Sequence, residues 1–203
     1  MRPLPANFII GAVLVALVVG VAALSLIWTP HDPTSLNIRG KFGDPSTLNW
    51  LGTDQLGRDI VSQLMAAARN SMTVALVAVL LGGSIGVALG LLASAIGGWV
   101  EDIVMRLADL GFAFPALLFA IMLAAVFGPS LTNAVLAIAF INIPIFARVA
   151  RASANQIWTR EYVLAARAAG MNKLSITWDH ILPNIAAAVI VQATIEFAVA
   201  ILA

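Results

Sequence analysis

The chain has 203 residues, of which 61% are apolar and 10% are charged, with a net charge of +1 and no cysteine. A soluble domain carries about 25% charged residues, so this chain has too few polar groups to cover a water-facing surface. The small net charge argues against a nucleic-acid-binding protein, which needs a basic patch. The lack of cysteine excludes disulfides and thiolate metal sites. The composition predicts an all-α integral membrane protein built as a polytopic helical bundle.

Five apolar runs with few or no charges are the expected membrane spans. A bilayer core of about 30 Å is crossed by about 20 apolar helical residues. The first run is longer than the apolar part of a secretory signal, which has about 7–15 residues, so we expect it to remain as an uncleaved span. The five runs are residues 8–28, 71–96, 111–127, 131–147 and 185–203.

Basic residues near these spans indicate the orientation, because cytoplasmic segments carry more Lys and Arg. With the N-terminus in the cytoplasm, seven basic residues lie inside and four lie outside. The inside set is Arg2, Arg106, Arg148, Arg151, Arg160, Arg167 and Lys173, and the outside set is Arg39, Lys41, Arg58 and Arg69. This bias predicts a multi-pass protein with a cytoplasmic N-terminus.

Residues 29–70 form a long segment between the first two spans. Its first part is rich in Pro, Gly, Asp and Asn, which predicts turns. Asp59 is placed to cap an interfacial amphipathic helix over residues 60–70. The chain is therefore divided into residues 1–70, with the first span, the segment and this helix, and a transmembrane core of residues 71–203.

The second span contains Gly82, Gly86 and Gly90, and small residues at this spacing let helices approach closely in lipid. Ordinary helix packing and a pore-lining role are both compatible with the pattern. Residues 97–115 then mix acidic and apolar side chains, which predicts a short amphipathic helix on the cytoplasmic side. Pro115 is expected in the first turn of the third span, where its missing N–H costs little.

Motifs of nucleotide, metal and acyl-transfer chemistry are missing from the sequence. It contains no GxxxxGK[ST], HExxH, EF-hand loop or Ser-His-Asp spacing. The two histidines are far apart in the chain. The sequence predicts that this chain is not an enzyme by itself and holds no metal.

A charged stretch, REYVLAARAAGMNKLSITWDHILPN, interrupts the apolar runs. Its residue types predict a helix over residues 161–169 that ends at Gly170 in the left-handed conformation. A second helix is expected over residues 173–181, capped by Asn172 and ending before Pro183. Spacing alone leaves two interpretations open, a docking element for another protein or an amphipathic loop that rests on lipid headgroups.

This stretch resembles the EAA motif of permease subunits of binding-protein-dependent ABC importers. The matching residues are Glu161, Ala165, Ala166, Gly170, Leu182 and Pro183. His180 replaces the usual isoleucine, as is frequent in the peptide/nickel branch of the family. The same branch is suggested by Leu51-Gly52-Thr53-Asp54 with Gly57-Arg58-Asp59, by Phe114-Pro115, and by Ala147-Arg148 with Arg151.

The resemblance implies a six-span permease fold with five spans present, so we expect a chain truncated at its C-terminus. It implies that the EAA loop, residues 148–184, is a cytoplasmic coupling element for a separate ATP-binding subunit, which would hold ATP and Mg. The implied partners are a second permease subunit, two ATP-binding subunits, an extracytoplasmic solute-binding protein and the lipid of a bacterial inner membrane. The implied cargo is di- or oligopeptides, or nickel.

Several polar residues have more than one interpretation. Local capping and contact with the solute-binding protein are both open for Thr53, Asp54, Arg58 and Asp59. Cytoplasmic anchoring and contact with the ATPase are both open for Arg148, Arg151 and Arg167. A carboxylate in mid-span is costly in lipid, so Glu196 is expected to line the substrate path, to make a buried hydrogen bond, or to be protonated and passive.

Two other classes of function remain open. A secondary transporter would use Glu196 or Asp109 as a proton or ion site and would need no ATPase, but it gives no reason for the EAA-like loop. A non-transporting membrane scaffold would use the loop only to recruit a soluble partner.

Overall fold

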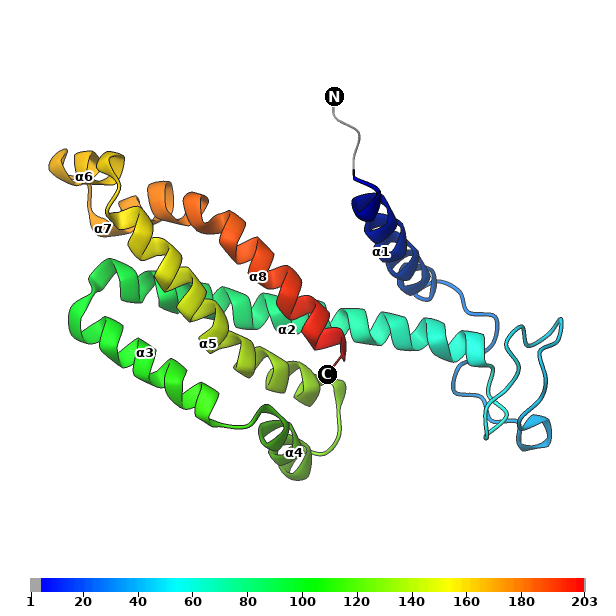
Figure 1. The fold of residues 1–203 in the computed structure, drawn as a ribbon. Coiled ribbons are helices and arrows are strands. Elements are labelled where there is room, and N and C mark those ends of the chain that lie inside the picture. Colours follow the sequence, from blue (N-terminus) through cyan, green and yellow to red (C-terminus); the bar gives the residue numbers. More distant parts are fainter. Residues whose placement is uncertain (1–4, 203) are drawn as a thin grey trace. The chain divides into compact units, whose positions relative to one another are not determined.

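A computed structural model describes residues 5–202, whose secondary structure is predominantly helical. Figure 1 shows the order of the elements along the chain. They are α1 (Ala6–Leu24), the 3₁₀ turn η1 (Ile38–Gly40), α2 (Ile60–Ile96), α3 (Gly98–Ala113), α4 (Ala116–Phe127), α5 (Leu131–Trp158), α6 (Glu161–Ala168), α7 (Lys173–Ile176), the π turn η2 (Thr177–Ile181) and α8 (Leu182–Leu202). Two compact units divide the chain between Thr73 and Val74, within α2.

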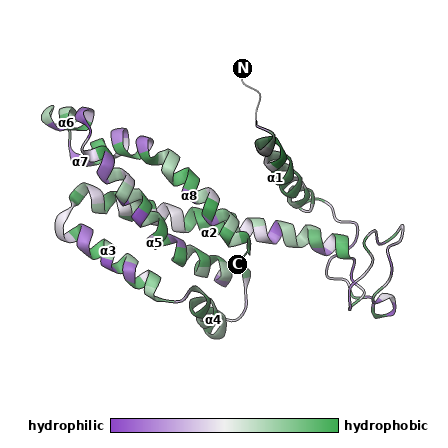
Figure 2. Cartoon of the chain, viewed as in Figure 1, coloured by the Kyte–Doolittle hydropathy of each residue, from purple (hydrophilic) through white to green (hydrophobic). Residues whose placement is uncertain are grey.

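An all-α membrane protein is confirmed, but its spans differ from the expected five. Within the described residues, three helices are long and apolar enough to cross a membrane, and a bent pair, α3 with α4, would make a fourth. The three are Ile60–Ile96, Leu131–Trp158 and Lys173–Leu202. The first expected span is a shorter apolar helix, Phe8–Leu24. Figure 2 shows α1 and α4 as almost entirely hydrophobic, whereas α3 and α6 carry hydrophilic residues.

The amphipathic helix expected at residues 60–70 is not a separate element. Helix α2 continues without a break for 37 residues, or about 55 Å at the α-helical rise, because good helix formers follow one another between the two predicted parts. Asp59 stands before its start as predicted. The Ser62 N–H donates to Asp59 Oδ2 at 2.8 Å, which satisfies one of the free N–H groups of the first turn.

The glycines of α2 bring this helix against α5. A Cβ added at any of the three would lie 2.4 Å from a backbone oxygen of α5, closer than real side chains come. The pairs are Gly82 with Ala139, Gly86 with Ile143, and Gly90 with Ala147. Close helix packing through small residues is therefore confirmed for this motif.

Two helices occupy the place of the expected cytoplasmic helix and third span. Helix α3 has 16 residues and α4 has 12, and both pack against α5. The chain bends by 79° between them. Phe114 is extended there because a residue before proline disfavours the helical conformation. Pro115 accordingly precedes α4 instead of lying in its first turn, which corrects the prediction.

Helix α5 is the central element of the second unit. Phe146 of α5 is buried with Ala75 and Val79 of α2 and Ala200 of α8. A second apolar cluster joins later residues of α5 to the segments that follow it. Its buried members are Ala150, Ala154, Val163, Ile176, Ile181 and Ile185. The loop that follows α5 is thus part of the packed bundle.

Candidate functional site

Four of the EAA-like residues, Glu161, Ala165, Ala166 and Gly170, lie on an ordered segment between α5 and α8, hereafter the 160–181 loop, and Leu182 and Pro183 begin α8. Helix α6 ends as predicted, with Gly170 in the left-handed region at φ +86°. The Gly170 N–H donates to the Arg167 carbonyl at 3.0 Å, and the Met171 N–H donates to the Ala166 carbonyl at 3.1 Å. This pair of bonds is a Schellman motif, in which the left-handed residue is usually glycine.

The second helix begins as predicted and ends differently. Asn172 caps α7, since its side-chain oxygen accepts the Ser175 N–H at 2.8 Å. The predicted end before Pro183 is wrong, because α7 continues through the π turn into α8. Residues Lys173–Leu202 therefore form one helical stretch of 30 residues.

The π turn explains how Pro183 is accommodated inside this helix. In a regular α-helix a proline removes a donor and collides with the carbonyl four residues earlier, and a π turn relieves this by widening the backbone spacing. The Leu182 N–H reaches back to the Thr177 carbonyl. The side-chain amide of Asn184 donates to the His180 carbonyl at 2.6 Å.

One side of α6 is anchored to the bundle. Val163 has no exposed surface, and it is buried with Ala150 and Ala154 of α5. Ala166 and Met171 pack against the same cluster. The conformation of the loop is therefore set by apolar burial and by backbone caps, without any ion pair among its own described residues.

The other side of the loop is exposed. Glu161, Ala165, Gly170 and Pro183 are exposed, while Ala166 and Leu182 are half-buried. Apolar side chains are exposed beside them, at 49% for Leu164, 78% for Leu174 and 71% for Trp178. Figure 2 shows the mixture of hydrophilic and hydrophobic residues on α6 and α7. The structure therefore brings four of the EAA-like residues together on the 160–181 loop, followed directly by Leu182 and Pro183 at the start of α8, and the exposed surface is partly apolar.

The two arginines of α5 are engaged within the second unit. Arg148 pairs with Asp109 of α3, and its guanidinium carbon lies 4.2 Å from the ring centre of Phe112. Arg151 Nε lies 3.3 Å from Glu101 Oε1. Both arginines thus connect α5 to α3. Arg167, on α6, is exposed.

The acidic partners of these arginines were missed by sequence reasoning. Glu101 and Asp109 lie about 40–50 residues before them in the chain, and no local pattern links such distant positions. Only the packing of α3 on α5 brings them together. Asp109, the candidate ion site of a secondary transporter, is therefore in an ion pair in this structure.

Glu196 is buried in α8, with 8% of its surface exposed. The Gln192 side-chain amide donates to Glu196 Oε1 at 2.7 Å. This arrangement supports the interpretation of a buried hydrogen bond, and a role in the substrate path stays a prediction.

The four candidate contact residues Thr53, Asp54, Arg58 and Asp59 lie in residues 29–59, hereafter the 29–59 segment. They belong to the first unit and form hydrogen bonds within it. Thr53 Oγ1 accepts the Gly43 N–H at 2.7 Å. Asp54 accepts from Arg58 Nε at 2.8 Å and forms an ion pair with Arg58 Nη2 at 2.7 Å. Asp59 is buried and accepts from Asn49 Nδ2 at 3.0 Å. The structure supports the local capping interpretation for these four residues, and contact with a partner stays a prediction.

These bonds change the acidity of the two carboxylates. Burial alone would raise the pKa of Asp59, but hydrogen bonds from Asn49 and Ser62 and the nearby His31 hold the pKa below its ordinary value. Burial opposes ionisation of Asp54 too, and the bonds from Arg58 outweigh it, so its pKa lies well below the usual range. Both groups favour their charged forms because those forms accept several hydrogen bonds.

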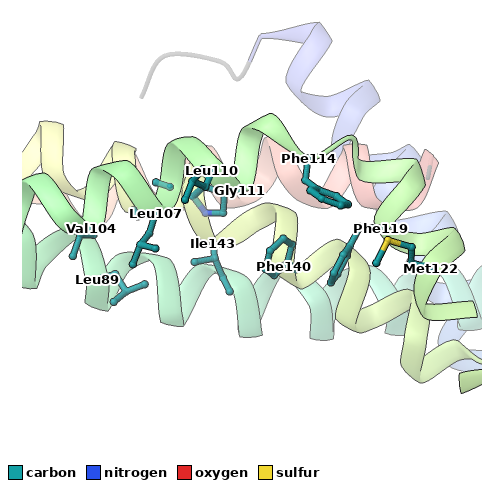
Figure 3. Close-up of a pocket in the computed structure, with 13 residues that line it drawn as sticks. Leu89, Val104, Leu107, Leu110, Gly111, Phe114, Phe119, Met122, Phe140 and Ile143 are labelled. Atoms are coloured by element: carbon teal, nitrogen blue, oxygen red, sulfur yellow. The ribbon is translucent and has the colours of Figure 1, made fainter. Parts of the chain in front are cut away.

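The second unit also contains an apolar cavity of about 480 Å³ (Figure 3). Val104, Leu107 and Leu110 of α3 border it, as do Phe119 and Met122 beyond the bend. Its lining carries no charged side chain. A peptide backbone or a metal ion would find no polar side chain among these lining residues.

Comparison with known proteins identifies the family. The model of the family described as "Binding-protein-dependent transport system inner membrane component" matches residues 84–203. The chain belongs to this family. Its matched region runs from the middle of α2 to the end of the chain and includes the whole 160–181 loop, so these permeases are its relatives across most of the second unit.

Three curated permeases are similar along nearly the whole chain. The dipeptide transport system permease protein of Alkalihalophilus pseudofirmus is 38% identical over 96% of this chain and 64% of its own length. The probable D,D-dipeptide transport system permease protein of Escherichia coli is 37% identical over 92% and 64%. The nickel transport system permease protein of Escherichia coli is 35% identical over 91% and 66%. The chain thus spans about two thirds of these relatives' length, and it is confirmed as a multi-pass membrane protein of the peptide/nickel permease group.

Proposed function

We propose that this chain is the permease subunit of an ATP-driven importer, and that the 160–181 loop couples it to a separate ATP-binding subunit. The cargo would be a di- or oligopeptide, or nickel, because relatives with 35–38% identity carry these names. ATP and Mg would be bound by the partner subunit, and this chain would form half of the translocation path.

The observation that carries the proposal is the division of the 160–181 loop into two sides. Val163 anchors one side in the bundle, and Ala166 packs beside it. Glu161, Ala165, Gly170 and Leu164 are exposed on the other side. An exposed apolar patch of this kind is typical of a protein-interaction surface. A loop that is both fixed and exposed can transmit the motion of a docked protein to the helices that hold it.

The remaining partners follow from the same assignment. A second permease subunit would complete the path, two ATP-binding subunits would drive it, and an extracytoplasmic solute-binding protein would deliver the cargo. The N-terminus and the 160–181 loop would face the cytoplasm of a bacterium. Each ligand would act by favouring one of two conformations, since a ligand shifts an equilibrium only through different affinities for its states.

Co-purification of the permease with its proposed ATP-binding subunit tests this proposal. Gly170→Val places a β-branched residue at φ +86°, and Gly128→Val places the same residue at another positive φ, +81°, between α4 and α5. We expect the Gly170→Val permease to retain at least tenfold less ATP-binding subunit than wild type, while the permease remains in the membrane. Gly128→Val should retain it. Equal binding by wild type and both variants would refute the coupling role of the loop.

A further inference from the structure

A polar network joins three helix ends beside the 160–181 loop. Glu101, in the first turn of α3, forms an ion pair with Arg151 of α5, with 3.3 Å between Oε1 and Nε, and it accepts a hydrogen bond from Asn155 Nδ2 of α5 at 3.3 Å. The Asn155 side-chain oxygen accepts from Ser94 Oγ of α2 at 2.5 Å. Glu101 is thus the residue through which the start of α3 is bonded to α5 and, through Asn155, to α2.

The same helix ends are bonded to the 160–181 loop. Lys173 Nζ, at the start of α7, donates at 3.3 Å to the carbonyl of Ile96, the last residue of α2. Val163 of α6 is buried against α5. A displacement of the loop therefore acts on α2 through Lys173 and on α5 through the apolar cluster. The side chains of the network extend this connection to the start of α3.

The backbone between α2 and α3 does not supply this connection. It consists of Gly97, followed by Gly98 as the first residue of α3; their φ values are +71° and +58°, and a Cβ at either would meet nothing within 4 Å. Two unpacked glycines can change conformation at little cost. Arg148 and Asp109 form another α3–α5 pair two turns further along, but their side chains are 48% and 63% exposed, whereas Glu101 is only 26% exposed.

We propose that Glu101 is a positioning residue for energy coupling, which makes the start of α3 move together with α2 and α5 when the docked loop moves. This role rests on the proposed function of the loop. Figure 3 shows Val104, Leu107 and Leu110 of α3 beside the apolar cavity, which continues past the bend at Phe114. Without Glu101, movement of the loop would displace α5 and α2 while α3 lagged behind them.

A coupling role and a merely structural role of Glu101 have different signatures. Partly exposed ion pairs contribute little to folding stability, so Glu101→Gln should leave the amount of assembled complex unchanged. Loss of concerted movement should instead lower the substrate carried per ATP hydrolysed. The charges can also be exchanged between α3 and α5. The double variant Glu101→Arg, Arg151→Glu restores an ion pair with its charges reversed.

The experiment uses the full-length permease in liposomes with its partner permease, two ATP-binding subunits and binding protein. Uptake of a radiolabelled Ala-Ala dipeptide, with ⁶³Ni²⁺ as the second probe, is divided by ATP hydrolysis in the same vesicles. We expect Glu101→Gln to lower this ratio threefold to tenfold, and the charge exchange to restore at least half of it. Asp102→Asn is the matched control, because Asp102 is the exposed neighbour on α3 and has no bonded partner among the described residues.

Three results would overturn the inference. The ratio could be unchanged in Glu101→Gln, the Asp102→Asn control could lower it equally, or uptake and hydrolysis could fall together with the amount of complex. If the wild-type permease retained no ATP-binding subunit, the proposed function itself would fail, and the role of Glu101 would fail with it.

Discussion

The 29–59 segment and the 160–181 loop are both charged segments outside the apolar helices, but they are built in opposite ways. In the 29–59 segment the polar side chains hold the structure, with Asp54 and Asp59 each accepting several hydrogen bonds. In the 160–181 loop the structure is held by buried Val163 and by backbone caps at Gly170 and Asn172.

The difference shows which charges remain available to another molecule. A carboxylate that already accepts several hydrogen bonds loses them if it turns to a partner, and the groups left behind are then unsatisfied. Asp54 and Asp59 are in this position. Glu161 and Arg167 are exposed on α6 and can change partners without disturbing the anchor at Val163. A charged motif therefore indicates a docking surface only where other residues hold the backbone.

The largest effect is expected from a substitution that removes the apolar anchor of the loop. Val163→Asp buries a carboxylate without a partner, which should destabilise the packed loop by about 3 kcal/mol or more. Amide hydrogen exchange over residues 160–181 should accelerate at least a hundredfold. Leu164→Asp, at a neighbouring position that is 49% exposed, is the control and should exchange like wild type. Equal acceleration in both would show that the loop is not held by its buried side.

The second prediction breaks the polar structure of the 29–59 segment. Asp59→Ala removes the cap of α2 and the acceptor for Asn49, and should destabilise the segment by about 2 kcal/mol. Hydrogen exchange of residues 46–64 measures the effect. Asp44→Ala serves as the control, since Asp44 is exposed and has no side-chain bond among the described residues. No difference between the two variants would contradict the role given to Asp59.

The third prediction separates the two regions by pH. The pKa values of Asp54 and Asp59 are lowered in the folded segment, so their stabilisation is fully present above the ordinary carboxyl pKa of about 3.9. It is lost as the pH falls from about 4 through the lower folded pKa values. Hydrogen exchange, corrected for its intrinsic pH dependence, should therefore show the 29–59 segment loosening below about pH 4. The doubly substituted Asp54→Asn, Asp59→Asn protein should lack this dependence.

The smallest effect is expected for the exposed part of the same network. Arg58→Ala removes an ion pair whose side chains are 30% and 20% exposed, and pairs of this kind contribute about 0.5 kcal/mol. Exchange in the 29–59 segment should accelerate only two- to threefold. Arg39→Ala, which removes an exposed arginine with no ion pair among the described residues, should leave the rate unchanged. An effect as large as that of Asp59→Ala would mean that Arg58 organises the segment.

The local features of both regions were predictable because short-range chemistry determines them. Gly170 follows strong helix formers and can adopt the left-handed conformation. Asn172 and Asp59 have side chains that can accept hydrogen bonds from a first helical turn. The spacing of Gly82, Gly86 and Gly90 likewise indicated close packing, although the partner helix could not be named from it.

The tertiary features could not be predicted in the same way. Residues 98–113 have the composition of an interfacial helix, and only their packing on α5 places Glu101 and Asp109 opposite arginines. The continuation of the helix through Pro183 depends on a π turn, whereas the usual effect of proline is to end or kink a helix. Sequence spacing also left the direction of Glu196 open, because its burial depends on how α8 packs against its neighbours, α5 among them.

The π turn has a consequence for the geometry of the loop and α8. Such a turn contains one residue more than an α-helical turn, and one residue corresponds to about 100° of rotation about the helix axis. The angle between the face that carries Leu174 and the face that buries Glu196 is thus determined by a single residue of the chain. Converting this turn into regular α-helix with the same residues would rotate one face against the other by about 100°. In this permease, the orientation of the proposed docking surface relative to its transmembrane helix is therefore a discrete quantity, changed only in whole-residue steps.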